Sequence, residues 1–270
     1  MEDFQRYFDL GLATTPEQRE QVYRVRYRVY CEEFNYEPAE SFPDQLETDE
    51  FDANSSHCLV THKGTGMPAG CARLVLVDEE SLMPMEKFCS SAIDEKILRS
   101  YDGNRDTICE FSRLGVDGAF RRRPGERASR FGEVSAIDCS KREERTFSLI
   151  AVATILSGLA MSDLLGRPHC FAMMEPFLPR LLRRSGLVVH RAGEEVEYHG
   201  QRAPYFFETA ENVEVMADEL KVFYAAIHAN FAASGALFQP STGGASHVGR
   251  AEPARSFWLP PSLGGPLVSF

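Results

Sequence analysis

The stretch Thr107-Ile-Cys-Glu-Phe-Ser-Arg-Leu-Gly-Val116 places a carboxylate and a guanidinium inside an otherwise apolar run. The length and composition of this run predict a buried β-strand. A charge in such a strand is costly unless it is paired or used in chemistry. Because side chains alternate along a strand, we expect Glu110 and Ser112 on one face and Arg113 on the other, unless a β-bulge intervenes.

Glu110 has two interpretations. Partial burial would raise the pKa of its carboxyl group, which could then remove a proton from an amine, directly or through water. The alternative is a structural ion pair with an arginine such as Arg73 in the preceding strand. The residues alone leave both open.

Strands and helices are interleaved along the chain, which predicts a mixed α/β or α+β domain. The expected strands are residues 4–12, 58–62, 69–77, 107–116, 169–174, 187–191 and 205–209. The expected helices are residues 16–34, 84–99, 143–165, 176–184 and 213–231. Long loops are expected at residues 35–54 and 118–140. Residues 1–231 are expected to form the domain, and residues 232–270, with their Gly, Pro and Ser, a flexible tail.

The first long helix has a defined start. Residues 15–18 (Thr-Pro-Glu-Gln) form a capping-box pattern with proline in the first turn. Arg26 then falls on the apolar stripe of this helix. An arginine there needs an anion nearby, and Asp49 and Asp52 in the following loop could supply it. The group is expected either to close over a small polar substrate or to pin the loop to the helix.

The composition is that of a globular chain of 270 residues, with 43% hydrophobic and 26% charged residues. The longest nearly apolar run, residues 147–161, is too short to span a bilayer. The first residues do not form a secretory signal. The seven scattered cysteines contain no CxxC pair. They favour a reduced, cytoplasmic setting over a disulfide scaffold or a zinc ribbon.

The charge is acidic overall, with 40 Asp and Glu against 29 Lys and Arg. Non-specific binding of nucleic acid is therefore not expected. Between Arg113 and Arg145, however, nine basic residues stand against six acidic ones. This local excess indicates either an acidic partner or phosphate, or a solvated charged loop.

Several common catalytic motifs are missing from the sequence. Ser112 is not part of a GxSxG motif, so a serine hydrolase is not expected. The phosphate loops GxxxxGK and GxGxxG are also missing. His57 and His62 lie on opposite faces of a strand, so no metal site is predicted.

An ordered series of motifs in the N-terminal half resembles the acyl-homoserine-lactone synthases and the long-chain N-acyl amino acid synthases. The family pattern is an arginine, an aromatic residue four positions later and another six beyond it. An acidic D-x-(F/Y)-D, an arginine on a strand and E-x-x-R on the next long strand follow. The matching residues are Arg26, Tyr30, Tyr36, Asp49, Asp52, Arg73, Glu110 and Arg113.

These motifs cover about residues 20–116. In particular, the chain looks like the acyltransferases associated with PEP-CTERM/exosortase systems. The stretches that carry this likeness are RYRVYCEEF (26–34) and ETDEFDANSSHCLV (47–60).

The resemblance implies a GNAT-like fold, which is a mixed central sheet flanked by helices. Its fourth and fifth strands splay into a V-shaped opening that holds a pantetheine arm, and these strands would be residues 107–116 and 169–174. After Val116 the chain lacks the Q/R-x-x-G-x-G/A turn with which acetyl-CoA enzymes hold the pyrophosphate. An acyl group delivered by acyl carrier protein is therefore favoured. No bound cofactor is expected, only acyl-phosphopantetheine as co-substrate.

The basic segment would then serve to dock the acidic carrier, because opposite charges steer association. CoA phosphates could use the same arginines. The expected docking residues are Arg121, Arg122, Arg123, Lys141, Arg142, Arg180, Arg183 and Arg184.

We therefore expect an N-acyltransferase that moves a fatty acyl group from acyl carrier protein to a small amine such as an amino acid. Glu110 would be the base, grouped with Ser112 and Arg113. Met173 and Met174 could line the acyl tunnel or be ordinary core. A network from the N-terminal half would order this region over the acceptor. Its expected members are Arg26, Tyr30, Tyr36, Asp49, Asp52 and Arg73.

Three alternatives stay open. An acyl-homoserine-lactone synthase using S-adenosylmethionine is the nearest, although Tyr36 stands where those enzymes typically have Trp. A conventional acyl-CoA-dependent GNAT N-acetyltransferase is the second. A non-catalytic module that binds an acyl carrier is the third.

Overall fold

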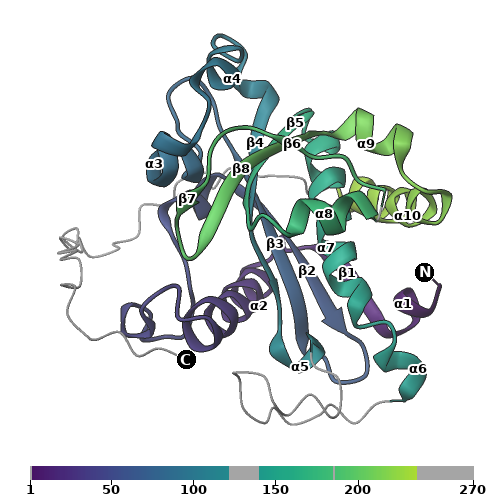
Figure 1. Ribbon diagram of the computed structural model, residues 1–270. Coiled ribbons are helices and arrows are strands. Elements are labelled where there is room, and N and C mark those ends of the chain that lie inside the picture. Colours follow the sequence, from purple (N-terminus) through teal and green to yellow (C-terminus); the bar gives the residue numbers. More distant parts are fainter. Residues whose placement is uncertain (1, 122–139, 185, 236–270) are drawn as a thin grey trace, which may run out of the picture. The chain divides into compact units, whose positions relative to one another are not determined.

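A central β-sheet runs through the computed structural model, which describes residues 2–121, 140–184 and 186–235 (Figure 1). Its strands follow the order β1-β2-β3-β4-β5-β8-β6, and β7 pairs with β8. Neighbouring strands are antiparallel except β4 and β5, which are parallel. The predicted mixed α/β class is confirmed. The chain divides into residues 1–240 and 241–270, and only the first unit contains described residues.

The strands differ greatly in length. They are β1 (Phe8–Leu12), β2 (Ser55–His62), β3 (Pro68–Leu76), β4 (Ile108–Val116), β5 (His169–Met174), β6 (His190–Arg191), β7 (Val196–Glu197) and β8 (Gln201–Glu208).

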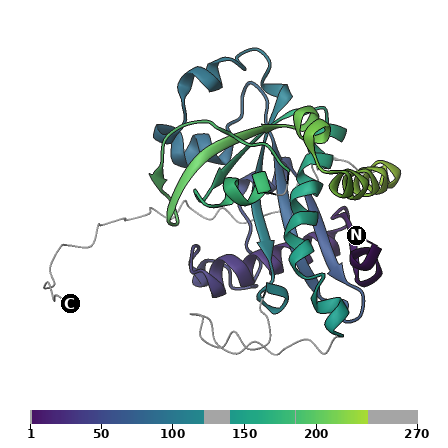
Figure 2. The same ribbon diagram turned by 45° about the vertical axis from the view of Figure 1, so that its right-hand side comes forward.

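The α-helices surround this sheet (Figures 1 and 2). They are α1 (Glu2–Tyr7), α2 (Pro16–Arg26), α3 (Pro84–Cys89), α4 (Glu95–Arg99), α5 (Gly118–Arg121), α6 (Lys141–Glu144), α7 (Ser148–Leu164), α8 (Leu178–Arg184), α9 (Thr209–Val215) and α10 (Asp218–Ser234). A π-helix, η1 (Tyr27–Glu33), continues α2. The 3-10 helices are η2 (Ala39–Ser41), η3 (Glu50–Asn54), η4 (Ser90–Ala92) and η5 (Arg105–Thr107).

The middle strands are covered on both faces. Cys58 and Val60 of β2 belong to the large core that α7 and α10 help to form. Leu59, between them, packs with Val22 and Val25 of α2 in a second cluster. The period of two along the strand therefore sends alternate side chains to opposite layers. Strand β4 is held at the centre of this arrangement, between β3 and β5.

The predicted helix over residues 16–34 is confirmed as α2 followed by η1. Thr15 Oγ1 accepts a hydrogen bond from the backbone N–H of Gln18, and the Gln18 side chain accepts one from the Thr15 N–H. This capping box satisfies donors that the first turn leaves free. The backbone N–H of Phe34 reaches the carbonyl of Val29, five residues back, which marks the π-helical end.

The prediction of a strand over residues 4–12 is wrong for its first half. Residues 4–7 belong to α1, and β1 begins at Phe8. Arg6 in the last turn suits the helix dipole. Phe4 is buried against Phe8, with ring centroids 5.0 Å apart, and against Phe223 of α10, at 5.3 Å. Packing of this helical face therefore outweighs the strand pattern.

Two further helix predictions are corrected in the middle of the chain. The segment 84–99 is broken into α3 and α4, because the Asp94 side chain caps a new helix by accepting from the Lys96 N–H. The segment 143–165 is also divided, because its first two residues belong to the separate helix α6, where the Ser140 side chain accepts from the Glu143 N–H, and α7 begins only at Ser148. A local cap thus starts a helix that periodicity alone does not show.

The C-terminal elements also differ in their bounds. The predicted strand 187–191 is reduced to β6, whereas the strand predicted at 205–209 begins earlier, at Gln201, because it forms a hairpin with β7. The helix predicted at 176–184 begins at Leu178. The helix predicted at 213–231 is two helices, α9 and α10, separated by extended backbone at Met216 and Ala217. Helix α10 includes residues 232–234, and residues 236–270 of the expected tail lie outside the described residues.

Candidate active site

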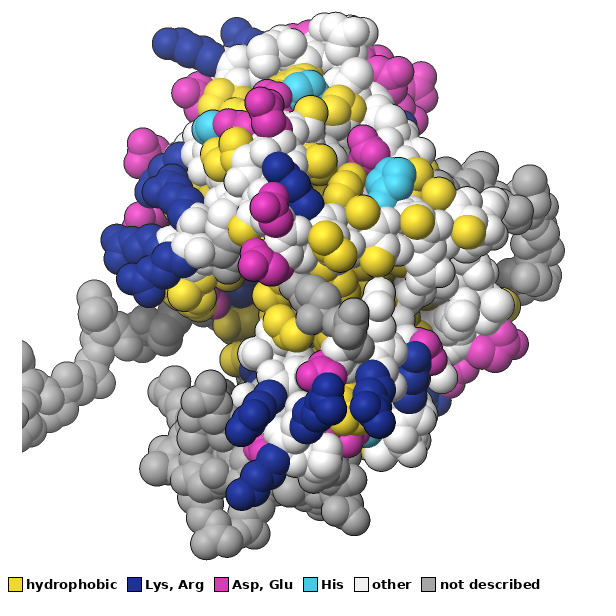
Figure 3. Space-filling model, turned by 90° about the vertical axis from the view of Figure 1, so that its right-hand side faces the viewer, with side chains coloured by type: hydrophobic (Ala, Val, Ile, Leu, Met, Phe, Trp, Pro, Cys, Tyr) yellow, Lys and Arg dark blue, Asp and Glu magenta, His cyan; other side chains and the backbone are white. Residues whose placement is uncertain are grey.

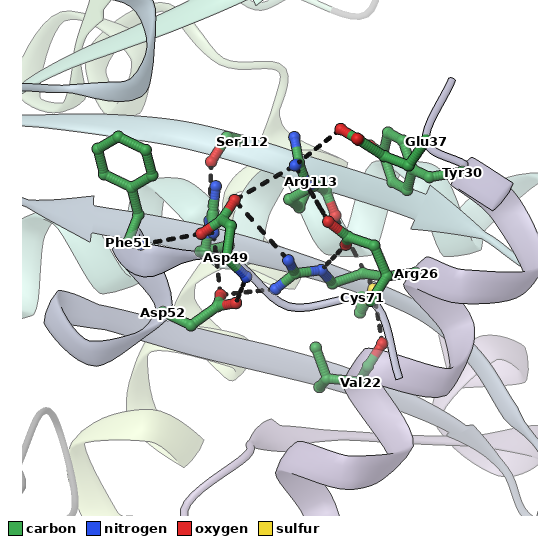
Figure 4. A network of polar contacts seen from close by, with 12 residues as sticks. Val22, Arg26, Tyr30, Glu37, Asp49, Phe51, Asp52, Cys71, Ser112 and Arg113 are labelled. Carbon is green, nitrogen blue, oxygen red and sulfur yellow. Dashed lines mark hydrogen bonds and ion pairs between the residues drawn. The ribbon is translucent and has the colours of Figure 1, made fainter. Parts of the chain in front are cut away.

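Arg26 lies in a buried network of ion pairs (Figure 4). Its side chain is completely buried. The guanidinium donates through Nε to Glu47 Oε2, and through Nη1 to Asp52 Oδ1 at 2.6 Å. Both carboxylates belong to the segment between η1 and β2. The network therefore pins this segment to α2, which is one of the two roles expected for Arg26.

Arg73 of β3 and Arg113 of β4 extend the network onto the sheet; Figure 4 labels Arg113 beside Asp49. Arg73 Nη1 donates to Asp49 Oδ1 at 2.5 Å and to Asp52 Oδ1 at 2.9 Å. Arg113 Nη2 lies 3.2 Å from Asp49 Oδ2 and 3.1 Å from Glu47 Oε1. Carboxylates from one loop thus join a helix and two strands.

The electrostatics favour the ionised state of Asp52 and disfavour that of Glu37. Burial would raise the pKa of Asp52, but the Arg26 and Arg73 guanidiniums outweigh it and hold that pKa well below its usual value. Burial raises the pKa of Glu37, which lies 3.3 Å from Arg113. Removing one member would leave an opposite charge buried without a partner, which is strongly unfavourable.

A β-bulge in β4 overrides the alternation expected for this strand. The register of β4 against β3 shifts by one residue beside Ser112, which pairs with Arg73. Arg113 adopts a left-handed conformation, with φ of 51°. Arg73 Nε donates to Ser112 Oγ at 3.1 Å, so Ser112 and Arg113 join the same network instead of pointing to opposite faces. The Tyr30 hydroxyl donates to the Leu114 carbonyl at 2.8 Å beside the bulge.

Glu110 stands apart from these ion pairs. Its side chain is only 3% exposed, and its Oε2 accepts a hydrogen bond from the Met85 N–H at 2.8 Å. Burial raises the pKa of Glu110 to about 8, and the Met85 hydrogen bond and the charges of Arg73 and Arg113 offset this only in part. In the described part of the chain no ion pair to Glu110 is found, so the alternative of a pair with Arg73 does not hold.

Strands β4 and β5 separate directly after Glu110. Their parallel pairing covers only Ile108–Glu110 and His169–Phe171, although both strands continue. This is the splay that was predicted between the fourth and fifth strands. A cavity of about 250 Å³ lies here and takes lining residues from both strands.

The lining of this cavity combines polar and apolar side chains. Polar lining residues are Tyr30, Tyr36, Glu110, Ser112, Arg113, Glu175, Tyr198, Arg202 and Asn212. Apolar lining residues include Ile155, Leu159, Met173, Met174, Leu182 and Phe207. A buried carboxyl group with a raised pKa beside an apolar wall suits proton removal next to an apolar chain.

The predicted docking residues do not all lie together in sequence or structure. Three are exposed on α8: Arg180, Arg183 and Arg184. Arg121 on α5 and Arg142 on α6 each form an ion pair with an acidic residue of the chain, and Lys141 is exposed on α6. Arg122 and Arg123 lie outside the described residues. Figure 3 shows hydrophobic side chains in the middle of one face and Lys and Arg side chains gathered below them.

Three residues of the site were not identified from the sequence. Glu47 stands two positions before Asp49 in an acidic run, and that run was the signal for it. Tyr198 and Arg202 lie on the hairpin formed by β7 and β8, and they line the cavity. No motif marks that hairpin in the sequence.

Comparison with known proteins agrees with this architecture. Residues 25–129, less than half of the chain, match the model of the acetyltransferase (GNAT) domain family. The matched range contains the network, the bulge and Glu110. A search of curated proteins finds no match.

Solved structures with the same fold include the following three. TofI, in a ternary complex with an inhibitor and MTA, is 17% identical, with a TM-score of 0.55 over 79% of this chain and 99% of TofI. The CoA-dependent acyl-homoserine lactone synthase MesI is 18% identical, with a TM-score of 0.52 over 82% of this chain and 95% of MesI. FeeM, an N-acyl amino acid synthase from uncultured soil microbes, is 13% identical, with a TM-score of 0.51 over 77% of this chain and 94% of FeeM.

At these identities the likeness is one of fold. The chain has a GNAT-like fold, and its architecture is similar to that of an acyl-homoserine lactone synthase and an N-acyl amino acid synthase. The family-model match supports an N-acyltransferase enzyme.

Two features are absent from residues 2–121, 140–184 and 186–235. No helix in these ranges is long and apolar enough to cross a membrane. No three His, Cys, Asp or Glu side chains in them are grouped so that they could hold a metal ion.

Proposed function

We propose that this protein is an N-acyltransferase that moves a fatty acyl group from acyl carrier protein to the amine of a small molecule such as an amino acid. The observation that carries the proposal is Glu110, a buried carboxyl group with a pKa of about 8 at the splay between β4 and β5. A general base works best when its pKa is near the operating pH.

The reaction needs a base because an ammonium group has no free electron pair. Glu110 removes a proton from the acceptor, directly or through one water, as the amine nitrogen attacks the thioester carbonyl carbon. The new C–N bond forms, the C–S bond breaks, and the carrier leaves as its thiol once it has taken up a proton. Backbone N–H groups left free where the strands separate would hold the thioester oxygen.

The other predicted residues have supporting roles in this proposal. The network around Arg26 holds residues 34–54 against the sheet and so shapes the acceptor side of the cavity. Met173 and Met174 line the wall that receives the acyl chain. The exposed arginines of α8 dock the acidic carrier, together with the basic residues of α5 and α6.

The proposal includes the setting in which the enzyme works. Acyl carrier protein and its fatty acyl groups place the reaction in the cytoplasm. The motif stretches at residues 26–34 and 47–60 support an association with PEP-CTERM/exosortase systems.

The test is mass spectrometry of lipid extracts from cells that express the wild-type chain, Glu110→Gln or Glu95→Gln. Glu95 is exposed on α4 and serves as the matched control. A new N-acyl amine should appear with wild type and Glu95→Gln and be lost with Glu110→Gln. Normal product from Glu110→Gln would remove Glu110 as the base. No product from wild type, in cells or with purified acyl carrier protein and CoA thioesters, would overturn the proposal.

A second candidate is an acyl-homoserine lactone synthase, which the similarity to MesI favours. The same extracts decide between them, because a lactone product with S-adenosylmethionine would identify this activity. Activity of the purified enzyme with acyl-CoA, compared with its activity with acylated carrier protein, would identify the acyl donor.

A further inference from the structure

Arg202 is a cavity residue to which the reaction described above assigns no role. It is the second residue of β8, opposite Val196 of β7. Its side chain is half-buried and lines the same cavity as Glu110. Its Nε atom is buried and has no hydrogen-bond partner.

The surroundings of Arg202 differ sharply from those of Arg113, the other arginine on the cavity wall. Arg113 lies within 3.3 Å of carboxylate oxygens of Glu37, Glu47 and Asp49. Within the described ranges, by contrast, no hydrogen bond or ion pair reaches the Arg202 side chain. A guanidinium that is partly removed from water without an anion is unfavourable, so this side chain is suited to receive one.

Aromatic contacts hold Arg202 in place without neutralising it. Its guanidinium carbon lies 5.3 Å from the centroid of the Tyr36 ring. The turn that joins β7 to β8 is fastened on two sides. Tyr198 stacks on Phe88 of α3 at 6.3 Å, and His199 lies 5.1 Å from the Tyr36 ring. The cation is thereby fixed at the cavity wall.

We propose that Arg202 binds the carboxylate of the amine acceptor and thereby makes the enzyme selective for α-amino acids over simple amines. This inference rests on the proposed function. A guanidinium presents paired N–H donors that match a carboxylate, and such charge-assisted bonds are strong and directional. An α-amino acid carries its carboxylate one carbon from its amine. Binding the carboxylate therefore also places the amine for proton removal.

The position of Arg202 favours the acceptor as the source of this anion. The donor also carries phosphate, but the whole pantetheine arm separates that phosphate from the thioester. Glu110 and Arg202 line the same cavity. An anion bound here is therefore near the base and the reacting amine, rather than at the far end of the arm.

The experiment compares acceptors that differ only in the carboxylate. Four purified proteins are compared: wild type, Arg202→Gln, Arg202→Lys and the control Arg191→Gln. Each is supplied with acyl groups as thioesters of acyl carrier protein or of CoA. The acceptors are the common amino acids, their decarboxylated amines and S-adenosylmethionine, and products are counted by mass spectrometry. Arg191 lies on the neighbouring strand β6, is exposed and pairs with Glu195, so it controls for loss of a surface arginine. Thermal unfolding confirms that each variant is folded.

We expect wild type and Arg191→Gln to acylate one or more amino acids at least about tenfold better, in kcat/KM, than the corresponding decarboxylated amines. Arg202→Gln should raise KM for the amino acid by tenfold or more, leave turnover of the decarboxylated amine nearly unchanged, and so abolish the preference. Arg202→Lys should keep part of the preference for the amino acid over its decarboxylated amine. The reactions with S-adenosylmethionine show whether the enzyme uses this acceptor or one of the common amino acids.

The outcomes that contradict the inference are distinct from those that contradict the proposed function. A preference that survives in folded Arg202→Gln, or a wild type that favours the decarboxylated amines, overturns the role of Arg202 while acyl transfer stands. Absence of transfer to every acceptor by wild type overturns both.

Discussion

The Glu110 carboxylate accepts a hydrogen bond from the backbone N–H of Met85 at 2.8 Å. Met85 is the second residue of α3, and an N–H in the first turn of a helix has no partner within that helix. The carboxylate satisfies this donor, and α3 in turn covers the carboxylate. This hydrogen bond therefore fixes the direction of Glu110, and it offsets only part of the rise in pKa that burial causes.

The first prediction concerns the pH dependence of the reaction. The proposed base, Glu110, can accept a proton only when it is deprotonated, and burial raises its pKa to about 8. The value of kcat/KM for wild type should therefore rise with pH up to about 8 and level off above it. Initial rates between pH 6 and 9.5 measure this, with Glu110→Gln as the comparison. A wild-type profile that is flat across pH 8 would contradict this assignment of the base.

The second prediction concerns stability. The folded protein holds the Glu110 proton up to about pH 8, whereas the unfolded chain releases it near the ordinary value of 4.5. The folded state binds more protons between these values, so its contribution to the free energy of unfolding falls as pH rises from about 4.5 to 8. In Glu110→Gln the free energy of unfolding does not fall with pH in this way, because the glutamine side chain does not titrate. Its amide oxygen can still accept the hydrogen bond from the Met85 N–H. Its melting temperature relative to wild type should therefore increase from pH 5 to pH 8. A constant difference across this range would show that Glu110 titrates normally.

The third prediction concerns the buried network. Arg73→Met leaves Asp49 and Asp52 with one guanidinium fewer, and should lower the free energy of unfolding by about 3–5 kcal/mol. Arg99→Met is the control. Arg99 is 74% exposed and pairs with Glu95 on the same helix, so its loss should cost less than about 1 kcal/mol. Urea denaturation measures both. Equal effects of the two substitutions would mean that the network adds little to stability.

The fourth prediction concerns the contact between α7 and β4. A Cβ atom at Gly158 would lie 2.4 Å from the Phe111 ring, which also lines the cavity. Gly158→Ala should therefore destabilise the protein by about 1–3 kcal/mol through overpacking. Adding Phe111→Leu should recover part of this loss. A double mutant cycle of melting curves measures the coupling, and purely additive effects would rule out the steric explanation.

The fifth prediction concerns the length of the acyl group. Met174 lines the cavity and is 6% exposed. Met174→Phe should shift the preferred donor toward shorter chains by filling space, whereas Met174→Ala should shift it toward longer ones. Competition between acyl donors of graded length, with products counted by mass spectrometry, measures the shift. An unchanged length profile in both folded variants would place the acyl chain elsewhere.

The amino-acid sequence by itself determined the features that depend on neighbouring residues. The capping box at Thr15 and Gln18 starts α2 because a side chain and a backbone N–H three residues apart meet in any helix of this pattern. The order of strands and helices, and the presence of Glu110 in a buried strand, also followed from local patterns. Arg26 and Asp52 could be grouped in advance because a buried charge needs an opposite charge, whereas Arg73 joined this group only through the family resemblance.

The tertiary structure decided what depends on contacts between distant segments. The bulge that turns Arg113 toward the network arises from the pairing of β4 with β3, and strand alternation predicts the opposite. The pKa of Glu110 depends on its covering by α3, which is brought to it from 25 residues away. Arg202 carries no local signal at all. It lines the cavity only because β8 pairs with β5 and its hairpin turn packs against Tyr36.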